Sequence, residues 1–198
     1  IKPVVTMSHS DIPLAIGTKY GGWDNKKVID LFVRYAKTIM ERYDKYVEYW
    51  IPFNEINDIF LSMSSLGQGA FIPSKECTFS GQEDNPLRRF EALNNMFIAS
   101  AKTVIEGRKI NPNFHFGTMI CHITRYPRTC HPNDVLLTWK DDAFYNCSCA
   151  DVMMKGEYSY FTLKRYKEYG YEPHLTEEEK QVLKEGVCDY YTFSYYQS

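Results

Sequence analysis

Strand-like apolar runs alternate with helical segments along this chain, and this alternation restricts the fold more than any other feature. The predicted order is strand, helix, strand, long loop, helix, strand, loop, helices and strand. Strands that alternate with helices are typical of parallel β/α units. No glycine-rich phosphate loop follows any predicted strand, so a dinucleotide-binding fold has no support. The sequence therefore predicts an α/β protein with a parallel sheet.

Apolar and aromatic runs predict four strands, at residues 1–7, 47–53, 114–121 and 187–195. Amphipathic periodicity and capping signals predict helices at residues 26–46, 86–110, 134–154, 158–169 and 176–186. Residues 57–85 lack periodicity and are predicted to be a long loop that forms one wall of a site.

A (β/α)8 barrel places its functional residues at the carboxyl ends of its strands. A complete barrel has eight strands and about 250 residues, whereas this chain has 198 residues and four predicted strands. We therefore expect a partial (β/α)8 TIM barrel.

The most informative stretch runs from Tyr49 to Asn57, where an apolar, aromatic strand ends abruptly in Asn54 and Glu55. A carboxyl group beside aromatic residues at the end of a buried strand is costly to ionise. A carboxyl that keeps its proton near neutral pH is what a general acid requires. The residues themselves leave another interpretation open, in which Glu55 caps a turn or pairs with a nearby Lys or Arg.

The overall composition excludes several classes of protein. The 23 basic and 25 acidic residues nearly balance and form no basic stripe, so no nucleic-acid partner is predicted. No apolar run has transmembrane length, so no membrane association is predicted. The six cysteines form no dense disulfide pattern and no secretory signal opens the chain, which favours a cytoplasmic location. The chain begins in mid-strand at Ile1 without Met, so we expect its true N-terminus to lie upstream.

Three motifs carry a resemblance to the family 1 glycoside hydrolases, and their order and spacing match along the whole chain: residues 5–13 (VTMSHSDIP), Gly21-Gly22-Trp23 and Phe53-Asn54-Glu55. Three runs look like the 6-phospho-β-glucosidase branch of that family: residues 19–23 (KYGGW), 53–57 (FNEIN) and 193–196 (FSYY). The β-glucosidase branch has Pro after the Glu, and Asn before the paired Tyr.

The resemblance implies that residues 1–198 are part of a single barrel domain, covering strands three to six, with its N- and C-terminal parts missing. It implies a retaining glycosidase in which Glu55 is the catalytic acid/base and Asn54 holds the sugar 2-hydroxyl. His9 would bind another hydroxyl of the cleaved sugar, and Tyr196 would hydrogen-bond the nucleophile. In a retaining enzyme one carboxyl protonates the leaving oxygen while a second, about 5 Å away, attacks the anomeric carbon.

The sequence departs from the family pattern in several places. The nucleophile motif, Ile/Val-Thr-Glu-Asn-Gly, does not occur, and neither the phosphate-binding loop nor the opening Gln-bearing strand is present. Pro52 replaces the usual Thr of the acid/base motif, and Ser10 replaces an aromatic residue of the sugar site. We therefore expect the 198 residues alone to be catalytically inactive.

The cysteine and histidine spacings, such as Cys147-Ser148-Cys149, fit no common zinc pattern, so no metal and no cofactor are predicted.

The favoured function is hydrolysis of phosphorylated β-glucosides in carbohydrate metabolism. The alternatives are a β-glucosidase for unphosphorylated sugars and an inactive sugar-binding or structural fragment. A partial barrel leaves two open sheet edges, so a homo-oligomer that pairs through these edges is also predicted.

Overall fold

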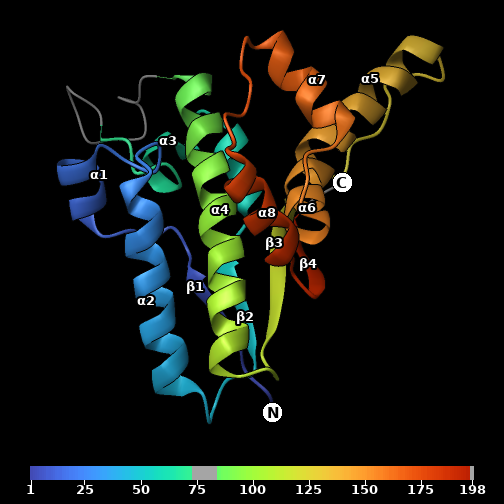
Figure 1. Ribbon diagram of the computed structural model, residues 1–198. Coiled ribbons are helices and arrows are strands. Elements are labelled where there is room, and N and C mark those ends of the chain that lie inside the picture. The colour runs from blue at the N-terminus through green and yellow to red at the C-terminus, as the bar shows by residue number, and fades with distance from the viewer. Residues whose placement is uncertain (73–83, 197–198) are drawn as a thin grey trace.

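A computed structural model describes residues 1–72 and 84–196 of the chain. Four strands form one parallel sheet in sequence order: β1 (Val4–Ser8), β2 (Tyr49–Phe53), β3 (His115–His122) and β4 (Tyr190–Tyr195). Three helices lie side by side over one face of this sheet (Figure 1): α2 (Lys27–Tyr43), α4 (Pro86–Ile110) and α8 (Glu177–Glu185). Each parallel pair is joined by a helical crossover, so the predicted run of β/α units is confirmed.

Strand β2 runs through the core and holds the turn at its carboxyl end in place. Trp50 and Phe53 are each 1% exposed, in keeping with a central strand of a parallel sheet that is covered on both faces. The Phe53 ring stacks on Phe32 of α2 with centroids 4.5 Å apart and meets the edge of Trp23 at 5.4 Å. Burying each of these rings contributes about 1.5–3 kcal/mol, so the carboxyl end of β2 is firmly held.

Strand β4 is an edge strand with one uncovered face. Its residues alternate between partly buried and exposed, and Tyr191, Phe193 and Tyr195 are 42%, 53% and 58% exposed. Strand β1 forms the opposite edge of the four-stranded sheet. Within residues 1–72 and 84–196, the sheet is therefore open at both sides, as predicted for a partial barrel.

The region predicted as one helix at 134–154 is helical but not continuous. It comprises α5 (Pro132–Asp142), the π-helical turn η3 (Ala143–Cys147) and α6 (Ser148–Lys155), and α7 (Tyr160–Glu168) comes next along the chain. Inside the π turn the buried Asn146 side chain accepts from the backbone N–H of Ile123 and donates to its carbonyl. This tie to the segment after β3 accounts for the local departure from α geometry. No helix in the described ranges is both long and apolar enough to cross a bilayer.

Two other expectations need correction. The helix α1 (Leu14–Tyr20) was not predicted, because seven residues without a buried side chain give no periodicity. The predicted loop at 57–85 contains the 3₁₀ helix η1 (Ile56–Phe60) and the short helix α3 (Ser64–Gly67), which are also too short to show a period. The part of that loop from 73 to 83 lies outside the described residues.

The buried face of α2 overlaps the predicted one but is shifted toward Ile29 and Ala36. The apolar spacing of residues 26–46 predicts a face that includes Val28, Phe32, Tyr35, Met40 and Tyr43, yet Tyr35 and Tyr43 are 46% and 44% exposed. Val28, Phe32 and Met40 are buried as predicted, Ile29 and Ala36 are buried beside them, and the helix packs against α4. The Tyr35 hydroxyl donates to the carbonyl of Met7, so this polar tip binds the edge strand rather than entering the core.

Gly186, which ends α8, packs directly against the backbone of α4. A Cβ atom at this position would lie 2.3–2.5 Å from the backbone O, Cα and C atoms of Ala101. Backbone cannot rotate away, so we expect Gly186→Ala to lower the free energy of unfolding by about 1–3 kcal/mol in a urea titration. Gly67→Ala is the matched control, because its Cβ would meet nothing within 4 Å. Equal stability of the two variants would contradict this packing.

Candidate active site

Glu55 stands where β2 ends and η1 begins. Its backbone has φ 42° and ψ 48°, in the left-handed region that costs a non-glycine residue about 1 kcal/mol or more. The residue is 8% exposed, its side chain makes no capping hydrogen bond, and no ion pair to it exists among the described residues. The predicted position of this carboxyl, buried at a strand end, is confirmed. Strained backbone of this kind is concentrated at active sites.

Asn54 and His9 lie at the carboxyl ends of adjacent strands. The Asn54 N–H donates to the carbonyl of Ser8 at 2.9 Å, which continues the pairing of β2 with β1. Asn54 is 8% exposed, whereas His9 is exposed and its backbone N–H donates to the carboxylate of Asp11. No hydrogen bond joins the His9 side chain to the other predicted site residues in the described part of the chain.

Tyr196 lies just after β4 and reaches Glu55 across the sheet end. Its hydroxyl donates to Glu55 Oε1 at 2.5 Å, and this hydrogen bond raises the pKa of Tyr196. The resemblance assigned this tyrosine to the nucleophile, whose motif does not occur in the 198 residues, so that role stays a prediction. The structure thus brings Glu55 and Tyr196 into contact and places Asn54 beside them.

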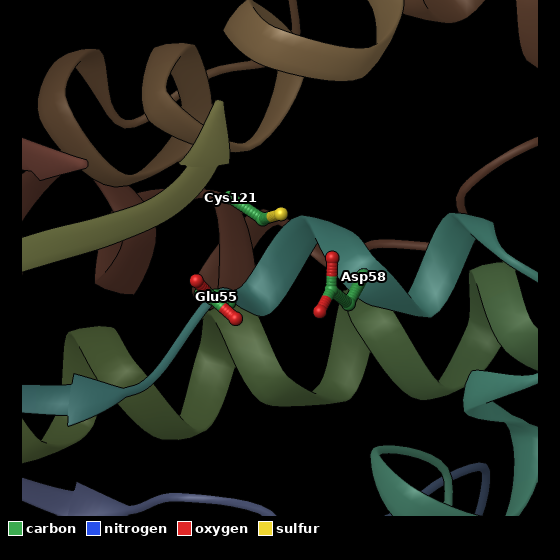
Figure 2. Close-up of side chains that lie close together, drawn as sticks. All are labelled: Glu55, Asp58 and Cys121. Carbon is green, nitrogen blue, oxygen red and sulfur yellow. The ribbon is translucent and has the colours of Figure 1, made fainter. Parts of the chain in front are cut away.

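Two further groups that the sequence did not single out lie against Glu55. These are Asp58 of η1 and Cys121 of β3, and the potential ligand atoms of the three residues lie within 4.8 Å of one another. Figure 2 shows the side chains grouped around the turn from β2 into η1. The Asp58 N–H donates to the carbonyl of Glu55 at 2.9 Å, and this turn places the two residues together.

Asn57 fixes this group of side chains. It is fully buried, accepts from the backbone N–H of Cys121 at 2.8 Å and donates to the carbonyl of the same residue at 2.8 Å. Its amide also donates to the carbonyl of Tyr145 at 3.1 Å. One side chain of η1 therefore holds both the end of β3 and the π turn η3 in place.

Tyr145 links η3 to the carboxylates. Its hydroxyl donates to Asp58 Oδ1 at 3.1 Å. Burial and the neighbouring Asp58 charge raise the pKa of Tyr145, so this phenol stays a proton donor to the carboxylate. π turns are frequent at functional sites, and this one turns the tyrosine toward the strand end.

Burial and mutual repulsion disfavour negative charge at this site. Burial, and then the charge of Glu55, raise the pKa of Asp58. Burial and both carboxylates raise the pKa of the Cys121 thiol to about 12. No Lys or Arg within residues 1–72 and 84–196 forms an ion pair with Glu55 or Asp58. Among the described residues, the site therefore concentrates acidic groups that have no ion-pair partner.

This environment predicts an unreactive thiol. Iodoacetamide attacks thiolates, so the raised pKa and burial of Cys121 should slow its alkylation about 100-fold or more relative to the exposed Cys130. Peptide mass spectrometry of the native protein at pH 8 measures both rates. Cys188, which is buried and has its pKa raised to about 12, is the internal control. Alkylation of Cys121 at a rate within about tenfold of Cys130 would contradict this view.

The fold and the site together define a class of protein. Parallel β/α units, with a buried carboxyl and polar groups gathered at the carboxyl ends of the strands, are the arrangement of (β/α)8-barrel enzymes. The glycosyl hydrolase family 1 model matches residues 1–198, and the chain belongs to that family.

Relatives and solved structures agree with this assignment. The chain is 37% identical over 198 residues to aryl-phospho-β-D-glucosidase BglH of Bacillus subtilis and 33% identical over 198 residues to 6-phospho-β-glucosidase AscB of Escherichia coli. Both comparisons cover the whole chain but 40% of the relative, so the chain spans about two fifths of such proteins. A β-glucosidase structure from Exiguobacterium marinum superposes with a TM-score of 0.77 at 25% identity, covering 98% of this chain and 42% of that one. The partial barrel fold is thereby confirmed.

Proposed function

We propose that the whole protein is a retaining glycosidase that hydrolyses 6-phospho-β-D-glucosides. The observation that carries this proposal is the buried, strained Glu55 at the end of β2, hydrogen-bonded by Tyr196, in a family 1 chain. Relatives at 33–37% identity bear the names of phospho-β-glucosidases, which supports the phosphorylated substrate class.

Each predicted site residue has a proposed role. Glu55 protonates the leaving oxygen in the first step and then activates water in the second. Asn54 holds the sugar 2-hydroxyl, where hydrogen bonds strengthen in the oxocarbenium-like transition state. His9, exposed at the end of the neighbouring strand, binds another hydroxyl of the same sugar. Tyr196 hydrogen-bonds the nucleophile, and in the described residues its hydroxyl donates to Glu55.

Asp58 is not proposed as the second catalytic carboxyl. The two carboxyls of a glycosidase flank the scissile bond, whereas Glu55 and Asp58 belong to one 3₁₀ turn and Asp58 binds the Tyr145 hydroxyl. The motif of the expected nucleophile does not occur in the 198 residues. We therefore propose that this segment by itself does not turn over substrate, and that it forms the central part of one barrel domain.

An assay with 4-nitrophenyl β-D-glucoside and its 6-phosphate tests the proposal. We expect kcat/KM to be higher for the phosphorylated substrate and the first product to keep the β configuration in proton NMR. Preference for the unphosphorylated glucoside would favour the alternative supported by the structural likeness to a β-glucosidase. An α product, or no hydrolysis of either substrate by the whole protein, would refute the retaining mechanism.

We also propose a cytoplasmic location and self-association. Cys121, Cys130, Cys147, Cys149 and Cys188 are free thiols, which fits a reducing compartment. In the 198-residue segment by itself, the open edges at β1 and β4 offer unpaired backbone groups to a second copy or to the strands that complete the barrel. Cell fractionation tests the location, and light scattering of the purified protein, with a monomer as the contrary result, tests the association.

A further inference from the structure

The side chains of Glu55, Asp58 and Cys121 lie close together (Figure 2), and one potential ligand atom from each lies within 4.8 Å of the others. We propose that these three residues form a binding site for one divalent cation of borderline softness, of which Zn²⁺ is the representative. Occupancy of this site would block the acid/base carboxyl, which makes the ion a reversible inhibitor.

The backbone presets the positions of the three donors. The Asp58 N–H donates to the carbonyl of Glu55 at 2.9 Å, so the backbone turn holds these two residues next to each other. Cys121 comes from a different element, but Asn57 clamps its N–H and carbonyl.

The donor set selects the kind of cation. Thiolate and carboxylate ligands together suit Zn²⁺, whereas Mg²⁺ and Ca²⁺ prefer oxygen ligands alone. Three protein ligands leave a fourth tetrahedral position for water. Binding converts the Cys121 thiol to a thiolate and releases its proton to the solvent. The two new metal–carboxylate contacts need no proton release when the carboxylates are ionised.

The surroundings favour a cation independently of the donor geometry. Buried charges in proteins are paired or coordinate metals, yet no Lys or Arg in the described ranges pairs with either carboxylate. Glu55 is 8% exposed, so solvent does little to balance a charge on its carboxylate.

Hydrogen bonds from an outer shell orient the proposed ligands. The Tyr145 hydroxyl donates to Asp58 Oδ1 and the Tyr196 hydroxyl donates to Glu55 Oε1. Each bond occupies one carboxylate oxygen, and the Asp58 carboxylate also meets the Cys121 thiol, which is another of the proposed ligands. Such outer partners typically raise metal affinity by about 10- to 100-fold.

Cobalt(II) provides a spectroscopic probe of the site. We would treat the purified protein with a chelator, titrate it with Co²⁺, and monitor the thiolate-to-cobalt charge-transfer band and the visible bands of tetrahedral cobalt. Zn²⁺ competition then gives the zinc affinity. The variants are Cys121→Ser and Asp58→Asn, with Cys147→Ser, an exposed thiol on η3, as the matched control. Circular dichroism verifies the fold of each variant.

We expect one cobalt ion per chain with a thiolate band in the wild type and in Cys147→Ser. Cys121→Ser should lose the band, and Asp58→Asn should bind zinc at least about tenfold more weakly. A thiolate band that survives in Cys121→Ser, or zinc affinities equal in all three variants, would overturn the proposal. Absence of stoichiometric binding in the wild type would do the same.

The inhibitory effect rests on the proposed function, but the site does not. In the whole protein, Zn²⁺ should inhibit hydrolysis of the 6-phosphorylated glucoside, and a chelator should restore it. Inhibition should need at least about tenfold more zinc in Cys121→Ser. If the thiolate-to-cobalt band appears but the whole protein hydrolyses neither glucoside, the glycosidase function is refuted while the metal site is supported. Hydrolysis that zinc inhibits equally in Cys121→Ser and the control would refute inhibition through this site.

Discussion

Replacing Glu55 with Gln should lower kcat/KM for glycoside hydrolysis by the whole protein about 10²- to 10⁴-fold. Gln keeps the size of the side chain and still accepts the hydrogen bond from Tyr196, but it neither gives nor takes a proton. The loss should grow as the leaving group becomes more basic, because a basic leaving oxygen depends most on protonation. A series of aryl 6-phospho-β-glucosides measures this dependence.

Glu48→Gln is the control for that experiment. Glu48 lies immediately before β2 on the same segment, where its side chain is 48% exposed and forms a surface ion pair with Lys2. Exposed pairs contribute little to stability, so this variant should keep the wild-type rate. Comparable losses in both variants, or a Glu55→Gln enzyme within about threefold of wild type, would argue against Glu55 as the proton donor.

The order of elements could be predicted because each long element carries its own signal. The helix α4 shows Pro at its first turn and an Asn85 side chain that accepts from the N–H of Arg88. The capping box of α8 is present, with Thr176 and Glu179 exchanging hydrogen bonds. The short elements α1, η1 and α3 were missed because they span less than the two or more turns that a periodic pattern needs.

The site could be predicted only in part, since sequence places residues on elements but not elements against each other. Glu55, Asn54, His9 and Tyr196 are predicted from strand ends and family motifs. Asp58 was hidden in a stretch without periodicity. Cys121 lies 63 residues after Asp58 in the sequence. The signal that could have revealed Asp58 is its i, i+3 spacing from Glu55, which becomes informative only when the turn is known to be 3₁₀.

Asn57→Ala should destabilise the protein by about 3 kcal/mol or more. This side chain makes three hydrogen bonds, two to backbone groups of Cys121 and one to the carbonyl of Tyr145. Truncation to Ala would leave all three backbone groups without this partner. Leaving a buried donor or acceptor unpaired costs about 1–3 kcal/mol per group. Urea unfolding monitored by circular dichroism measures the loss, and Asn113→Ala, an exposed asparagine just before β3, should change stability by less than about 0.5 kcal/mol.

Asn57→Asp separates the hydrogen bonds from the packing of this side chain. Asp keeps the shape and still accepts from the Cys121 N–H, but it loses both bonds that the amide donates. It also adds a third carboxyl to a cluster that already holds Glu55 and Asp58. We therefore expect Asn57→Asp to be at least as destabilising as the Ala variant at neutral pH, despite its closer fit. An Asp variant as stable as wild type would mean that shape, and not the donated hydrogen bonds, holds β3 and η3 against the turn that carries Glu55.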